Sequence, residues 1–280
     1  MRFFVFLKLP RFAWALRRYY CPVSKDALVL EVGSGGNPYM RSDILLDAYE
    51  ETQERHWVPL TSDRPTFIGK AEKMPFQNNA FDFVIASHVL EHSTDPDLFL
   101  NELQRVSKAG YIEVPIAIFE RLNPYKDHRL EIYLDNNLLV IRKKKGWQHD
   151  PELVELYERS IKSKFTSDFI PKNPFEFHVR YYWNNEINYK IVNNDFKITW
   201  VPPESTKINV NYSLKSKFKK SLEIFLSLIY KRKTKDYDLK GLLHCIHCGS
   251  DDFNADNSTI ICNECGKGLE IQNNIIREKK

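Results

Sequence analysis

Residues 27–36 read ALVLEVGSGG, a short apolar run that ends in a cluster of glycines. Residues 27–32 have the composition of a buried strand, and the glycines that follow are typical of a tight loop. Glycine lets the backbone approach a ligand closely. The stretch does not fit the dinucleotide fingerprint G-x-G-x-x-G, because Pro38 stands where the third glycine would be. The loop therefore disfavours a pyrophosphate, and it leaves open a ligand with a ribose, a carboxylate and an ammonium group.

Further apolar runs with the length of buried strands occupy residues 44–46, 81–86 and 111–114. Between the last two, Asp95 and Pro96 are a typical helix start, with Asp as N-cap and Pro at the first helical position. Phe99, Leu103 and Val106 then follow on one helical face. Strands that alternate with helical patterns predict an α/β fold with a doubly wound, mostly parallel sheet.

Several polar motifs follow these strands in a fixed order. Asp47 ends the second strand, where a carboxylate can accept both hydroxyls of a ribose. Residues 71–76 read AEKMPF, with a polar start and an apolar end that suit an adenine ring. Residues 81–92 read FDFVIASHVLEH, and residues 103–111 read LQRVSKAGY.

Together these motifs resemble the class I S-adenosylmethionine-dependent methyltransferases of the ubiquinone/menaquinone-methylase-like type, over residues 27–115. The resemblance implies a Rossmann-like fold and S-adenosylmethionine as cofactor. It implies that the glycine loop holds the methionine moiety, the acid after the second strand holds the ribose, and the A-E pair borders adenine. The residues that it assigns to the cofactor are Glu31, Gly33, Ser34, Gly35, Asp47, Ala71, Glu72 and Ser87. The chain departs from this pattern between Gly36 and Ile44, which is too short for a full crossover helix.

Methyl transfer requires alignment of donor and acceptor, and a hydroxyl acceptor also requires a base. His88 and His92 follow the strand at 81–86, at the sheet edge where open α/β sheets bind ligands. His128 belongs to a second polar cluster after residues 123–125. We therefore take His88, His92 and His128 as candidate catalytic residues. In the alternative interpretation, His92 only shapes a helix start and His128 lies in a solvated loop.

Four of the five cysteines form two C-x-x-C-G knuckles, Cys245 with Cys248 and Cys262 with Cys265. Two such knuckles are typical of a tetrahedral four-thiolate site, which predicts one structural zinc per chain. A rubredoxin-like iron site is the alternative. A module of about 40 residues hardly folds without such a metal. The segment resembles the zinc ribbons that occur as stand-alone partners or fused modules of methyltransferases.

Basic residues are unevenly placed, although the net charge is only +4. Residues 1–24 hold five basic side chains, no acidic one, and many aromatic and aliphatic ones. A second basic amphipathic helix is predicted at 214–232. Either segment packs on the domain or contacts an anionic membrane surface, since neither is apolar enough to span a bilayer. The predicted organisation is an N-terminal arm (1–24), a methyltransferase domain (25–212), a basic helix or linker (213–240) and a zinc ribbon (241–280).

The sequence thus predicts a methyltransferase that acts on a small molecule or on a lipid- or glycan-linked acceptor. Ser87-His88-Val89-Leu90 stands where exocyclic-amine methyltransferases carry D/N-P-P-Y/F, which argues against adenine N6 as acceptor. An RNA methyltransferase guided by the ribbon and the basic helix is one alternative. A non-catalytic subunit that binds the cofactor or serves assembly is another. We expect a cytoplasmic protein, with peripheral contact at the inner face of a membrane as an extension of the leading hypothesis.

Overall fold

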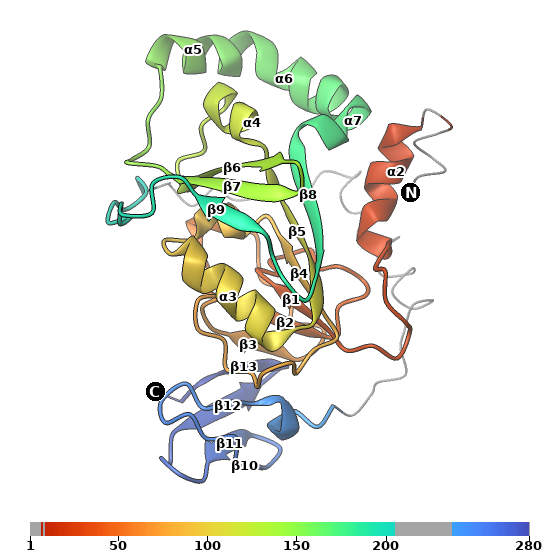
Figure 1. Ribbon diagram of the computed structural model, residues 1–280, viewed down its shortest axis with the longest axis vertical. Coiled ribbons are helices and arrows are strands. Elements are labelled where there is room, and N and C mark those ends of the chain that lie inside the picture. The colour runs from red at the N-terminus through yellow and green to blue at the C-terminus, as the bar shows by residue number, and fades with distance from the viewer. Residues whose placement is uncertain (1–6, 8, 205–236, 280) are drawn as a thin grey trace.

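The computed structural model describes residues 7, 9–204 and 237–279 (Figure 1). Its main sheet has the strand order β10-β11-β12-β13-β3-β2-β1-β4-β5-β8. The larger domain contributes β1 (Val29–Val32), β2 (Ile44–Asp47), β3 (Thr66–Ile68), β4 (Phe83–Ser87), β5 (Ala109–Pro115) and β8 (His178–Asn184). The first five of these strands are parallel, and β8 runs antiparallel to β5. The predicted α/β class with a Rossmann-like, mostly parallel sheet is confirmed.

The two faces of the sheet are covered differently. Helix α3 (Pro96–Val106) packs on the face formed by Leu30 and Val32, and Asp95 caps it by accepting a hydrogen bond from the Leu98 amide at 3.1 Å. Because side chains alternate along a strand, Val29 points to the opposite face. There it packs with Tyr39 and the chain around Cys21, not with a crossover helix.

The connections in the first half of the domain are shorter than in a regular doubly wound sheet. Within the described residues 33–43, the link from β1 to β2 contains no helix, as its length predicted. The next link holds only the 3-10 turn η2 (Gln53–Arg55). Strand β3 was not predicted, because only two of its three residues, Phe67 and Ile68, are apolar.

Residues 116–177 and 185–200, which carry no clear sequence motif, form a cap at one end of the main sheet (Figure 1). A small second sheet has the order β6-β7-β9. The elements of the cap are α4 (Ala117–Leu122), β6 (Leu130–Asp135), β7 (Leu138–Lys143), α5 (Pro151–Leu156), η4 (Tyr157–Ile161), α6 (Lys162–Lys164), η5 (Phe165–Phe169), α7 (Ile170–Lys172), η6 (Pro174–Glu176) and β9 (Tyr189–Ile191).

The cysteine-rich segment extends the main sheet at its other end (Figure 1). Its elements are η7 (Lys240–Leu242), β10 (Phe253–Ala255), β11 (Thr259–Cys262), β12 (Gly268–Gln272) and β13 (Ile275–Glu278). Strand β13 pairs in parallel with β3, with Ile276 opposite Phe67. Leu243 and Ile276 are fully buried in the same apolar cluster as the strands of the larger domain. The ribbon therefore shares one sheet and one core with that domain.

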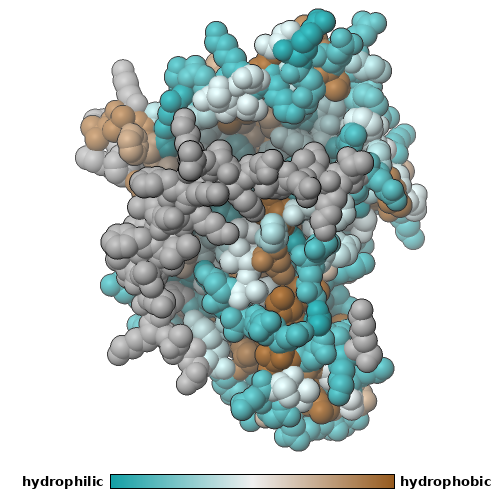
Figure 2. Space-filling view, turned by 180° about the vertical axis from the view of Figure 1, so that it is seen from behind, coloured by the Kyte–Doolittle hydropathy of each residue, from teal (hydrophilic) through white to brown (hydrophobic). Residues whose placement is uncertain are grey.

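The N-terminal arm contains helix α2 (Pro10–Leu16) and the turn η1 (Arg17–Tyr19). Its apolar side chains remain exposed at Leu7, Leu9, Phe12 and Leu16, and Figure 2 shows hydrophobic atoms gathered where this arm lies. The predicted helix at 214–232 lies outside the described residues. No helix in the described part of the chain is long and apolar enough to cross a membrane.

Candidate functional site

A pocket of about 490 Å³ opens at the carboxyl ends of β1, β2 and β4. Strands arranged in parallel bring their carboxyl ends to one edge, and this is where open α/β sheets bind ligands. The structure brings seven of the eight predicted cofactor residues to this pocket: Gly33, Ser34, Gly35, Asp47, Ala71, Glu72 and Ser87. They come from four separate stretches of the chain, which only the fold unites.

The glycine loop is held in a conformation that other residues adopt rarely. Gly33 has φ +68° and Gly35 has φ +59°. A Cβ on Gly33 would lie 2.5 Å from the side chain of Val89. The amide of Gly33 donates a hydrogen bond to the Leu46 carbonyl at 2.8 Å, which ties the loop to β2. Both conformation and space therefore require glycine at position 33.

Asp47 is nearly buried at the end of β2, and both of its oxygens have partners. Oδ2 accepts a hydrogen bond from the Gly35 amide at 2.9 Å, and Oδ1 accepts from Arg55 at 3.0 Å and from the Tyr49 amide at 3.1 Å. A ribose bound here would donate its hydroxyl hydrogen bonds to the same Asp47 carboxylate that accepts one from Arg55. Arg55 also lines the pocket, and no motif in the sequence identified it.

Glu31 is the one predicted cofactor residue that does not line this pocket. It is 3% exposed and lines a smaller adjoining cavity together with Ser34 and other residues. Its Oε2 accepts hydrogen bonds from the Tyr39 amide at 2.8 Å and the Ser42 hydroxyl at 2.5 Å. Burial raises the pKa of Glu31 to about 7, although these hydrogen bonds oppose the shift. The geometry is that of a residue that holds the β1–β2 connection in place.

A second cavity of about 240 Å³ adjoins this candidate cofactor pocket and shares Glu54, His88 and His92 with it. His128 lines the same cavity. The three candidate catalytic histidines, separated by up to 40 positions in the sequence, therefore face one space. His128 is buried, with only 7% of its surface exposed, whereas a side chain in a solvated loop would be mostly exposed.

His88 stands between two buried carboxylates. Its Nδ1 lies 3.5 Å from Glu91 Oε1 and its Nε2 lies 3.4 Å from Glu113 Oε1. Burial alone would lower the pKa of His88, but Glu113 and Glu91 outweigh it and raise that pKa to about 9. His88 is therefore cationic at neutral pH and unsuited to accept a proton. Its φ of +56° is unusual for a residue with a side chain and marks local strain at the site.

His92 has the opposite electrostatic environment. Burial, and then the neighbouring His128, lower the pKa of His92. Its Nδ1 lies 3.3 Å from the carbonyl oxygen of Asp127, so a tautomer with the proton on Nδ1 leaves a lone pair on Nε2. The lowered pKa favours the neutral form of His92 at pH 7.

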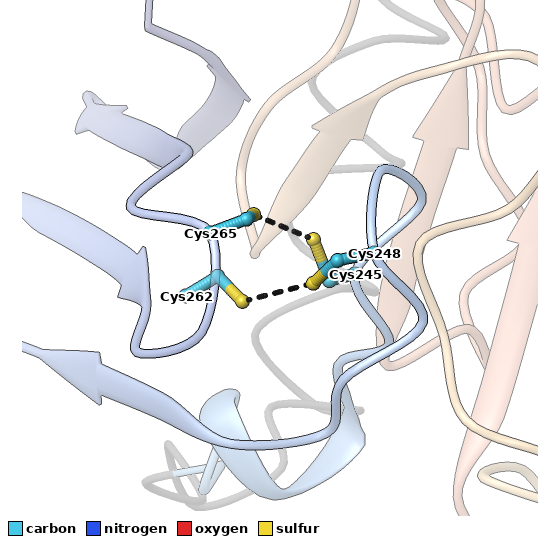
Figure 3. Close-up of side chains that lie close together, drawn as sticks. All are labelled: Cys245, Cys248, Cys262 and Cys265. Carbon is cyan, nitrogen blue, oxygen red and sulfur yellow. Dashed lines mark hydrogen bonds between the residues drawn. The ribbon is translucent and has the colours of Figure 1, made fainter.

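The four knuckle cysteines converge at the end of the ribbon (Figure 3). Cys245 Sγ lies 3.6 Å from Cys265 Sγ, and Cys248 Sγ lies 3.6 Å from Cys262 Sγ. Sulfurs around a tetrahedral zinc ion with Zn–S of about 2.3 Å are roughly 3.8 Å apart, so the arrangement fits such an ion.

The two histidines of the ribbon are engaged elsewhere. His244 contacts Asp251 at 2.7 Å, and His247 contacts Glu278 at 3.1 Å. The candidate metal centre is therefore a closed set of four thiolates, without an open coordination position.

Comparison with known proteins agrees with this geometry. Residues 30–112 match the sequence model of the family described as "Methyltransferase domain". The chain therefore contains a methyltransferase domain. The demethylmenaquinone methyltransferase of Streptomyces avermitilis is 43% identical over 54 residues, or 19% of this chain and 21% of that protein. The chain thus spans about a fifth of the length of this curated relative.

Three solved structures show partial similarity. An S-adenosylmethionine-dependent methyltransferase of Mesorhizobium loti is 12% identical, with 61% of this chain and 96% of that chain covered and a TM-score of 0.35. A chain in a complex of the Haloferax volcanii Trm112 methyltransferase activator with a candidate methyltransferase is 18% identical, with coverages of 48% and 72% and a TM-score of 0.31. A methyltransferase of Aquifex aeolicus is 22% identical, with coverages of 32% and 57% and a TM-score of 0.25. At these low TM-scores the domain assignment rests on residues 30–112.

Proposed function

We propose that this protein transfers the methyl group of S-adenosylmethionine to an acceptor whose reactive group enters the histidine-lined cavity. One observation carries this proposal: the cofactor pocket and the second cavity are neighbours that share His88 and His92. The reaction needs the sulfonium methyl group and the acceptor atom in line and in contact. Two adjoining cavities, one with the methyltransferase motifs and one with ionisable groups, meet this requirement.

The acceptor that we propose is a small molecule or a lipid- or glycan-linked group. A cavity of about 240 Å³ accommodates a group of modest size, and its lining of histidine and carboxylate side chains suits a polar acceptor group. The exposed apolar side chains of the N-terminal arm support peripheral contact with a membrane that carries such an acceptor.

For the ribbon we propose one structural zinc ion held by Cys245, Cys248, Cys262 and Cys265. In the strand order, β13 is separated from β4 by β3, β2 and β1, which corresponds to roughly 19 Å between β13 and β4 at ordinary strand spacing. The ribbon is thus on the side of the sheet away from the histidine-lined cavity. This placement supports a structural role and disfavours the alternative in which the ribbon guides RNA into the site.

The acceptor class can be tested with S-adenosylmethionine labelled in its methyl group. The purified chain is incubated with cell extract that is then separated into lipid, glycan, small-molecule, RNA and protein fractions. We expect label in the lipid, glycan or small-molecule fraction, and no transfer when Gly33→Ala replaces the wild type. Label in RNA alone would support the ribbon-guided alternative. Cofactor binding without label in any fraction would support a non-catalytic subunit.

A further inference from the structure

Glu91 is a buried carboxylate whose hydrogen-bonding capacity the fold does not use. It directly follows Leu90 in the turn η3 (Leu90–His92) and is 1% exposed. Within the described residues, neither of its side-chain oxygens receives a hydrogen bond. The nearest cationic group is His88, whose Nδ1 is 3.5 Å away in an ion pair without hydrogen-bond geometry. A carboxylate with free lone pairs in a buried place is costly, and such groups normally have partners or coordinate metals.

Two imidazoles face this carboxylate, and each is held by its Nδ1 atom. His92 Nδ1 lies 3.3 Å from the Asp127 carbonyl oxygen. His128 Nδ1 lies 2.5 Å from Glu120 Oε1, and the other oxygen of Glu120 accepts a hydrogen bond from Lys144 at 3.1 Å. These contacts of Nδ1 fix the orientation of both rings. The other ring nitrogen, Nε2, then remains as the potential metal ligand of each histidine. Histidines that bind metals typically donate the second ring nitrogen to a carbonyl or carboxylate in this way.

We infer that Glu91, His92 and His128 bind a divalent transition metal ion, with zinc as the probe of choice. One potential ligand atom of each residue lies within 4.8 Å of those of the other two. Ligands of a tetrahedral zinc ion are roughly 3.3 Å apart, so the three side chains would close by about 1.5 Å or less. Two imidazoles and one carboxylate are the ligand set of open metal sites, which keep a position for water or substrate.

The open position of this site would face the histidine-lined cavity, which all three ligands line. An ion there would hold an oxygen donor of the acceptor beside the methyl donor, a role that rests on the proposed function. The metal site itself does not rest on it, because the ligands and their supporting hydrogen bonds are independent of the cofactor. It also differs in kind from the ribbon, where four thiolates close the coordination shell.

The number of metal ions bound per chain tests whether Glu91, His92 and His128 form a metal site or have only a structural role. The full chain is stripped of metal, refilled with cobalt(II) as a probe, and titrated by absorption and elemental analysis. We expect two equivalents per chain: one with the intense near-ultraviolet absorption of a thiolate complex, and one with only weak visible bands. Glu91→Gln and His128→Ala should remove the weak-band equivalent or weaken it at least about 10-fold, and should leave the thiolate signal unchanged.

Two further variants serve as matched controls. Cys248→Ser should lose the thiolate signal and keep the weak-band equivalent, whereas His149→Ala, an exposed histidine outside the cavity, should keep both. A wild type that binds a single equivalent, lost in Cys248→Ser, would overturn the inference. So would Glu91→Gln and His128→Ala chains that still bind two. If circular dichroism shows that His128→Ala does not fold, the number of equivalents bound by the nearly isosteric Glu91→Gln tests the inference instead. Neither readout depends on methyl transfer.

Discussion

Substitution of Gly33 by alanine tests the cofactor loop most severely. Two independent penalties apply. Alanine at φ +68° enters the left-handed region, which costs a residue with a side chain about 1–2 kcal/mol. Its Cβ would also lie 2.5 Å from Val89 Cβ and Cγ2, and overpacking of this kind costs about 1–3 kcal/mol. The expected loss of stability is therefore about 2–5 kcal/mol, together with loss of cofactor binding because the loop must move.

The chain offers a matched control and a rescue for this substitution. A Cβ on Gly146 would meet no atom within 4 Å, so Gly146→Ala should change stability little. In Gly33→Ala/Val89→Gly the overlap is relieved, because glycine removes both the Cβ and the Cγ2 of Val89, whereas the backbone penalty remains. The two substitutions should therefore be coupled by about 0.5–3 kcal/mol, with the double variant more stable than the sum of the single ones.

Urea denaturation gives the stabilities, and titration with S-adenosylhomocysteine gives the binding. The reasoning is refuted if Gly33→Ala is as stable as Gly146→Ala and binds the ligand as well as the wild type. Additive effects of Gly33→Ala and Val89→Gly would refute the steric part alone.

Three other properties can be tested on the same protein. Cys248→Ser, or removal of zinc, should lower the melting temperature of the whole chain and not only of the ribbon, because β13 pairs with β3 and Ile276 is part of the shared core; a melting curve whose main transition is unchanged would contradict the shared core. The pKa of Glu31 in the fold is about 7, above the ordinary value of 4.5, so its stabilising effect is complete below pH 4.5 and is lost as the pH rises toward 7. Relative to Glu31→Gln, the wild type should lose up to roughly 1.4 kcal/mol per pH unit in that window, and parallel stability curves for the two proteins would count against the buried carboxyl. The arm should bring the protein to vesicles of anionic lipid at low salt and not to neutral ones, with weaker flotation for Phe12→Ser, whose parent side chain is 60% exposed; absence of flotation on both lipids would leave the arm as a packing surface.

The parts of the fold that could be predicted from the sequence are those encoded by neighbouring residues. The strand at 29–32 is entirely buried, and three of its four residues are therefore apolar, with Glu31 as the exception. Helix α3 begins where Asp95 and Pro96 place it, because a cap and a fixed proline φ act locally. The glycine loop and Asp47 converge because parallel strands end at one edge.

The features that escaped prediction depend on partners far away in the chain. Strand β3 exists because β2 and β13 flank it, and its own three residues carry no pattern. Arg55 lines the candidate cofactor pocket only because the loop after β2 folds back onto Asp47. Glu91 reads as an ordinary polar residue at a helix start, whereas His128, 37 positions later, lies beside it in the folded chain.

Cofactor binding measured by titration calorimetry tests the central claim most directly. The wild-type chain should bind S-adenosylhomocysteine at one site. Asp47→Ala should weaken that binding by about 1–3 kcal/mol, the loss expected from a charge-assisted hydrogen bond. A wild-type chain that shows no heat of binding and no thermal stabilisation with either S-adenosylhomocysteine or S-adenosylmethionine would contradict the account.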